Sequence, residues 1–161
     1  MKRVIIKKGN IFSVVIENSY KVYLQYVADD MTQLNSRVVR VFKQHYSLNE
    51  NPSMDEIVKD EMDFYAHTML RLAVWDDVFI KVGTHKDIGD AQNLMFRQTG
   101  DIDLSKITKS YKWYIWKINE PMVFIGELKE EFKNYEIGAV YPYSYILDRI
   151  RTGKYLEKIV E

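Results

Sequence analysis

The sequence predicts an α+β fold in one domain over residues 1–161, built on a curved antiparallel sheet that is partly an SH3-like barrel. Apolar and polar residues alternate with a period of two at 21–28, 112–119 and 122–128, which is typical of strands with two different faces. The chain also contains 12 Tyr and 7 Phe but only three Pro. Aromatic residues favour strands and prolines disfavour them, so this composition suits a sheet.

The N-terminal part of the chain predicts a hairpin. Residues 9–16 and 20–30 read as strands, and the polar segment 17–19 joins them as a tight turn. In the second strand, successive side chains point to opposite faces. Leu24 is expected in the core, and Tyr23 and Gln25 lie on the other face.

Further strands are expected where β-branched or aromatic residues cluster. The segment 37–46 reads as a strand, although Asn35 or Ser36 at its start could cap a helix instead. The polar segment 83–103 is expected to be irregular, with a strand or a helical turn inside it at 91–97. The remaining predicted strands are 64–70, a short one within 76–82, 112–118, 122–128 and 136–140.

Two short helices are predicted, near 53–61 and near 142–152. Ser53 and Glu56 have the spacing of a capping box, which starts the first helix. Pro142 suits the first turn of the second helix, and Gly153 suits its end. The expected core residues are Phe12, Leu24, Phe64, Trp113, Ile115, Phe124, Ile146 and Ile150.

The composition bears on the class of protein. Lys plus Arg and Asp plus Glu both number 23, and this balance makes a nucleic-acid partner unlikely because phosphate contacts usually require a basic excess. No apolar run approaches the roughly 18–20 residues that cross a membrane, so no membrane association is expected.

The basic start lacks the apolar region of a secretory signal, which makes a cytoplasmic location the expectation. The chain has no cysteine, which removes disulfides and thiol chemistry.

No pattern of residues indicates catalysis, a metal or a cofactor. His45, His67 and His85 have no metal-binding spacing, although a site assembled across strands stays open. The acidic pairs 29–30 and 76–77 border turns, where Asp is common. The nucleophile-elbow, P-loop and Rossmann patterns are absent from the sequence. We therefore expect no catalytic residue, no metal and no cofactor, and a protein that is not an enzyme.

Aromatic and basic residues alternate in the segment 109–117, and this favours an alternative hypothesis. Such a strand, with its central part at 111–117, could bind a nucleic acid or a small ligand by stacking. In a regular strand Trp113 and Trp116 point to opposite faces, so at most one of them is expected in a single core.

The hairpin carries a resemblance to a known family. The segment 9–16, the polar turn and the tyrosine-bearing strand 20–27 resemble the opening of the immunity protein 26 family, which is found in bacterial polymorphic-toxin loci. The later stretch 129–141, with Gly138 before Tyr141, is compatible with that family. The sequence departs from the family pattern at two points. No glycines follow the tyrosine of the second strand, and no proline follows the first strand. The segment 26–36 is also similar to a group of uncharacterised bacterial proteins.

The resemblance implies a small cytoplasmic protein that binds a toxin domain and neutralises it by steric occlusion, with no catalytic residue of its own. Binding of this kind uses an aromatic patch with a polar rim. Tyr23 and Gln25, on the strand face opposite Leu24, are the candidate partner-binding residues, with His67 and Trp75 as further candidates.

Overall fold

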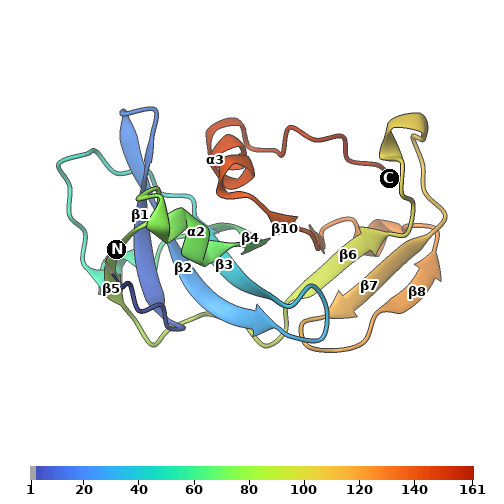
Figure 1. The fold of residues 1–161 in the computed structure, drawn as a ribbon, viewed down its shortest axis with the longest axis horizontal. Coiled ribbons are helices and arrows are strands. Elements are labelled where there is room, and N and C mark those ends of the chain that lie inside the picture. Colours follow the sequence, from blue (N-terminus) through green and yellow to red (C-terminus); the bar gives the residue numbers. More distant parts are fainter. Residues whose placement is uncertain (1–2) are drawn as a thin grey trace.

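The computed structural model describes residues 3–161, and these form an α+β fold with two sheets (Figure 1). The larger sheet has the strand order β10 (Val140–Tyr141), β4 (Met62–Thr68), β3 (Ser36–Phe42), β2 (Tyr20–Asp30), β1 (Asn10–Ile16) and β5 (Ile80–Thr84). The smaller sheet has the order β8 (Val123–Gly126), β7 (Trp113–Lys117), β6 (Met95–Thr99) and β9 (Glu136–Ile137). The predicted α+β class is confirmed, whereas the expected SH3-like barrel is not formed by the described residues. Within the described residues the sheets are mainly antiparallel and do not close into a barrel.

The predicted N-terminal hairpin is present, and its second strand bends strongly (Figure 1). Glu17 and Asn18 both have positive φ in the turn, a backbone shape that matches the twist of hairpin strands. The pairing of β2 with β3 shifts register between Tyr26 and Ala28. Such a bulge adds a residue to one strand and increases the local bend, which directs the far end of β2 toward the smaller sheet.

Both predicted helices are present. α1 (Met54–Ile57) begins with both hydrogen bonds of the Ser53–Glu56 capping box and is shorter than the predicted segment. α3 (Tyr143–Thr152) begins after Pro142 and ends at Gly153, whose φ of 83° is left-handed. Two short 3-10 turns lie in connecting segments: η1 (Leu104–Lys106) between β6 and β7, and η2 (Glu130–Phe132) between β8 and β9.

A third helix, α2 (Leu70–Trp75), lies between β4 and β5, and the sequence did not predict it. No side chain caps its first turn, so the usual start signal is missing. Leu70, Ala73 and Val74 are buried at helical spacing and hold the helix against the larger sheet.

The larger sheet and α3 enclose the main core. The buried cluster there contains five of the eight expected core residues: Phe12, Leu24, Phe64, Ile146 and Ile150. Trp113 is also buried, but in the smaller sheet, and Ile115 is only half-buried. The expectation for Phe124 is wrong, because this side chain is 60% exposed on the edge strand β8.

The opposite face of the larger sheet is covered as well. The chain between β3 and β4 folds back over it, and Ile57 packs there with Ile11, Tyr23 and Phe42 in a second cluster. The rings of Tyr23 and Tyr46 meet edge to face at 5.3 Å. Neither face of β2 is therefore open to solvent near Tyr23.

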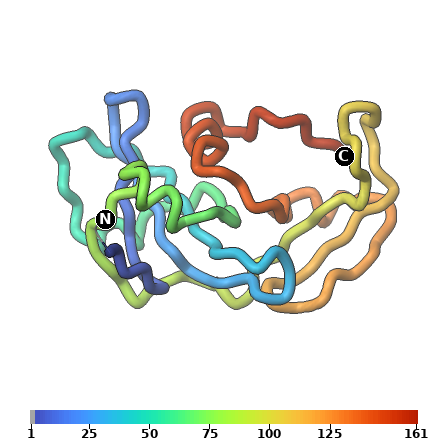
Figure 2. The backbone as a smooth tube through the Cα atoms, viewed as in Figure 1, coloured from blue at the N-terminus to red at the C-terminus, as the bar shows by residue number. Residues whose placement is uncertain are grey.

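The two sheets meet along a third cluster. Val27, Ala28 and Val38 of the larger sheet pack there against Phe96 and Trp116 of the smaller one. Figure 2 shows the chain after α3 running back toward the loop before β7. At its end Val160 is buried and the carbonyl of Glu161 accepts a hydrogen bond from Ser110, so this segment covers the smaller sheet. No helix among residues 3–161 has the length and apolar character needed to cross a membrane.

Candidate functional site

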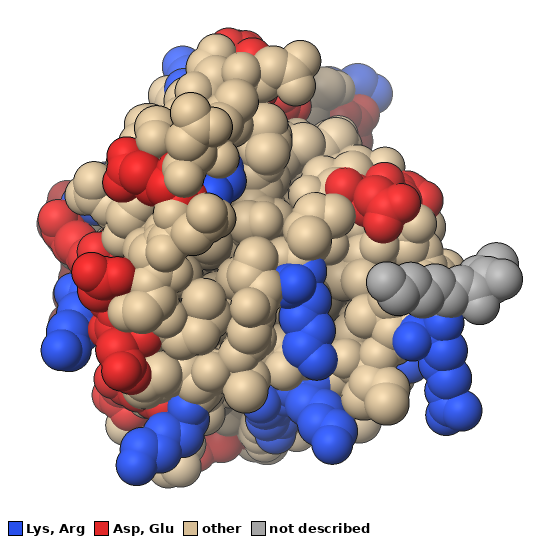
Figure 3. Space-filling model, turned by 90° about the vertical axis from the view of Figure 1, so that its left-hand side faces the viewer, with Lys and Arg blue, Asp and Glu red and all other residues tan. Residues whose placement is uncertain are grey.

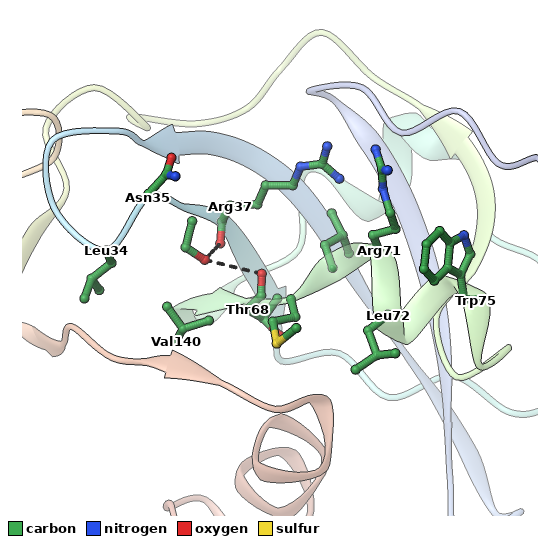
Figure 4. A pocket seen from close by; sticks show the side chains of 11 residues that line it. Leu34, Asn35, Arg37, Thr68, Arg71, Leu72, Trp75 and Val140 are labelled. Carbon is green, nitrogen blue, oxygen red and sulfur yellow. Dashed lines mark hydrogen bonds between the residues drawn. The ribbon is translucent and has the colours of Figure 1, made fainter.

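A hollow beside α2 is the candidate functional site (Figure 4). We call it the α2 groove; its volume is about 410 Å³, and it is lined by residues 34–37, 68–72, 75 and 140. These residues come from the turn between β2 and β3, the end of β4, α2 itself and the edge strand β10. Residues far apart in the sequence therefore meet at one place on the surface.

The α2 groove has an apolar wall that solvent reaches. Met69, Leu72 and Trp75 are spaced three apart, and they are 57%, 40% and 51% exposed. Residues at this spacing share one side of a helix, and here it is the side away from the buried Leu70 and Ala73. Large apolar side chains that gather on the surface mark interaction sites more often than isolated ones do.

Two arginines flank the apolar wall. The guanidinium of Arg71 lies 5.8 Å from the centre of the Trp75 ring, and that of Arg37 lies 5.4 Å from the Tyr26 ring. Within residues 3–161 neither Arg37 nor Arg71 forms an ion pair with an acidic side chain. Asp29, which faces Arg37 across the strands, is paired with Lys8 instead. Both guanidinium groups therefore lack a contacting carboxylate among residues 3–161.

Positive and negative side chains are mixed on the surface near β1 and β5. Figure 3 shows lysine and arginine side chains there beside aspartate and glutamate side chains, with a broad uncharged area between them. This mixed surface agrees with the overall balance of 23 basic and 23 acidic residues.

The structure places the four candidate partner-binding residues differently. Trp75 lies in the α2 groove. Tyr23, Gln25 and His67 are buried and offer no contact surface to a partner in this conformation, contrary to the expectation from strand alternation. The physical reason is that long-range segments cover them. The Gln25 amide donates to the carbonyls of Gly9 and His85 at 3.1 Å each and accepts from Arg40 Nε at 2.9 Å.

His67 belongs to a buried hydrogen-bond network around Asp30. The Oδ2 atom of Asp30 lies 2.9 Å from His67 Nε2 and 2.9 Å from Trp116 Nε1. The Oδ1 atom accepts from the backbone N–H groups of Asn119 and Gln33. A buried carboxylate needs such partners, because an unpaired one is costly.

Burial lowers the pKa of His67, and the neighbouring Asp30 carboxylate only partly opposes this effect. A neutral imidazole that donates from Nε2 to Asp30 fits this environment. The Nδ1 atom of His67 is buried and has no hydrogen-bond partner among the described residues. Since the His67 side chain has no exposed surface, it cannot touch a substrate in this conformation. The link between the two sheets is the hydrogen bond from Trp116 to Asp30.

The structure also bears on the alternative site at 111–117. Trp113 pairs with Thr99 and Trp116 with Phe96, so the two indoles do lie on opposite faces of the smaller sheet. Only Trp116 lies in the core between the two sheets, so the expectation that at most one tryptophan shares a single core is confirmed. Trp113 is buried as well, but on the other face of the smaller sheet, which the C-terminal segment covers. Lys109, Lys112 and Lys117 are paired with Glu127, Asp101 and Glu120. Neither tryptophan can stack on a ligand without opening the sheet.

Among residues 3–161, no group of three or more histidine and acidic side chains could hold a metal ion. In comparisons with protein-family models, curated proteins and solved structures, nothing matches this chain. The α2 groove is thus the feature on which a functional argument can rest. Its sequence signal was the three-residue spacing of Met69, Leu72 and Trp75, which a strand interpretation of this region hides.

Proposed function

We propose that this protein is a non-catalytic protein-binding module, and specifically an immunity protein that neutralises a cognate toxin by covering it. The observation that carries the proposal is the exposed apolar wall formed by Met69, Leu72 and Trp75 next to two arginines that have no acidic partner among residues 3–161. Tryptophan and arginine are the residue types that most often dominate the energy of protein interfaces.

The chemistry of the α2 groove defines the partner. An apolar side chain of the partner would fill the hollow against Trp75 and Leu72, and carboxylates beside it would meet Arg37 and Arg71, whose side chains extend to the same side in Figure 4. Arginine pairs with a carboxylate through two parallel hydrogen bonds, which fixes orientation as well as adding affinity. The partner is therefore a protein whose contact surface is acidic around an apolar centre.

The assignment of the partner as a toxin domain rests on the resemblance of residues 9–30 to the immunity protein 26 family. Inhibition would be steric: the bound module excludes substrate from the toxin, and it needs no catalytic group of its own. The resemblance also implies that this encounter takes place in the cytoplasm.

The proposal expects a toxin domain among the genes next to this one, and the test is co-expression with that domain. We expect the unchanged protein to relieve the growth inhibition that the toxin causes, and Trp75→Ala and Arg71→Glu to lose this protection. Phe124→Ala is the matched control, because Phe124 is an equally exposed aromatic residue on the distant strand β8. Protection that fails with the unchanged protein, or that survives Trp75→Ala, would contradict the proposal.

A further inference from the structure

A second cavity, of about 200 Å³, lies between the smaller sheet and the segment around the end of α3. It shares no lining residue with the α2 groove. Four cationic side chains line it, Arg97, Lys133, Arg149 and Lys154, against the single carboxylate of Glu136. Such an excess of positive charge around a small hollow favours an anion.

Arg97 is the most unusual of these side chains, because it is only 9% exposed. Its Nε atom donates to the carbonyl of Tyr135 at 3.0 Å, and its guanidinium lies 5.1 Å from the centre of the Trp113 ring. Its Nη1 atom is buried and finds no acceptor among the described residues. Buried charged donors almost always have an acceptor, and the described residues supply none to this atom.

The nearby carboxylates do not supply that acceptor. Glu136 is held by Arg149 through two hydrogen bonds of 2.7 and 3.0 Å. Glu161 lies 3.5 Å from Lys133, which also contacts Glu130 at 3.0 Å. Lys154 forms no ion pair with an acidic side chain within residues 3–161. Arg97 and Lys154 are therefore the two cations of the cavity that lack a contacting counter-charge.

We propose that this cavity binds the phosphate group of a small molecule, with Arg97 and Lys154 as its main ligands. The planar fork of an arginine matches two phosphate oxygens, and a lysine adds a point charge for a third. A phosphate offers three acceptor oxygens and carries more negative charge than a carboxylate, which suits a cavity with four cations. Because Nη1 is covered in the structure, binding includes a turn of the Arg97 side chain toward the cavity.

The proposal is independent of the toxin partner and is tested on the full chain. Inorganic phosphate is titrated by isothermal calorimetry at constant ionic strength, and thermal unfolding is followed in parallel, with glycerol phosphate, acetate and chloride as further probes. A ligand of the folded state raises the unfolding temperature in proportion to the logarithm of its concentration. We expect phosphate or glycerol phosphate to bind and to raise the unfolding temperature, and acetate and chloride to do neither.

Arg97→Met removes the guanidinium but keeps much of its volume, and we expect it to weaken phosphate binding at least about tenfold. Arg151→Met is the matched control, because Arg151 is exposed and lines neither this cavity nor the α2 groove, and it should bind phosphate as the unchanged protein does. Should Arg97→Met fail to fold, Lys154→Ala at the exposed side of the cavity should weaken binding two- to threefold, by about 0.4–0.7 kcal/mol.

The probe that binds more tightly identifies the source of the phosphate: glycerol phosphate indicates a phosphate ester and inorganic phosphate indicates the free ion. Equal effects of phosphate, acetate and chloride would overturn the proposal. So would phosphate binding that persists unchanged in both Arg97→Met and Lys154→Ala.

Discussion

The indole Nε1 of Trp116 donates a hydrogen bond of 2.9 Å to Oδ2 of Asp30, a residue 86 positions earlier in the chain. The same oxygen lies 2.9 Å from Nε2 of His67. Asp30 ends β2 and His67 lies in β4, both in the larger sheet, whereas Trp116 lies in β7 of the smaller one. One carboxylate therefore ties the two sheets together at their junction, next to the strand ends that shape the α2 groove.

Removing that carboxylate is expected to destabilise the fold strongly. Asp30→Ala leaves the buried donors of Trp116 and His67 without an acceptor, and breaking such a buried network costs about 3–5 kcal/mol. Urea denaturation measures the loss. Asp63→Ala is the control, since Asp63 is exposed on β4. This substitution should lower the free energy of unfolding by less than about 0.5 kcal/mol. Similar losses in the two variants would show that the network does not join the sheets.

The stability of the protein should fall as the pH is lowered below 7. Burial lowers the pKa of His67 in the folded state, so between that pKa and the ordinary value near 6.5 the unfolded chain binds more protons. Stability is complete above about pH 6.5 and decreases below it, by up to about 1.4 kcal/mol per pH unit for one group.

The pH effect is measured as the free energy of unfolding between pH 7.5 and about 5. We expect His67→Gln to remove this part of the pH dependence, and His45→Gln, at an exposed site, to retain it. A pH dependence that is the same in both variants would assign it to other groups.

Gly138 is expected to tolerate no side chain. A Cβ atom placed there would lie 1.9 Å from Cη2 and 2.4 Å from Cζ2 of the buried Trp116 ring. Gly138→Ala should therefore lower the free energy of unfolding by about 1–3 kcal/mol, because an added carbon in a packed core displaces its neighbours. Thermal unfolding checks this, with Gly100→Ala as the control, where the nearest atom would be a Tyr114 ring carbon at 3.3 Å. Equal unfolding temperatures for the two variants would contradict the packing around Trp116.

Fluorescence quenching should separate Trp75 from the other two tryptophans. Trp75 is half-exposed in the α2 groove, whereas Trp113 and Trp116 are buried. We expect acrylamide to quench one accessible component of the emission, and Trp75→Phe to remove that component without changing the stability by more than about 0.5 kcal/mol. Quenching that remains after this substitution would mean that another tryptophan is exposed.

The local features of the fold could be predicted from the sequence because short-range chemistry determines them. The capping box at Ser53 and Glu56, the left-handed Gly153 and the hairpin turn at residues 17–19 each depend on a few neighbouring residues. α2 escaped prediction because it lacks a capping side chain and is held instead by burial against the larger sheet.

The candidate site was less predictable, because contacts between residues far apart in the sequence determine which side chains are exposed there. Alternation placed Tyr23 and Gln25 on the face opposite Leu24, but burial there depends on the chain after β3 and on the backbone of His85. Likewise, the network joins Asp30 to residues 37 and 86 positions away. Trp75 was the one candidate that remained at the surface, since nothing in the described chain folds over the outer side of α2.

The most direct measurement is the dissociation constant of the complex with the toxin domain that the proposal requires, determined by calorimetry for the unchanged protein, Trp75→Ala and Phe124→Ala. If the α2 groove is the interface, Trp75→Ala should weaken binding by about 2 kcal/mol or more, roughly thirtyfold, and Phe124→Ala should leave it unchanged. Equal dissociation constants for all three proteins, or no binding by the unchanged protein, would contradict the account.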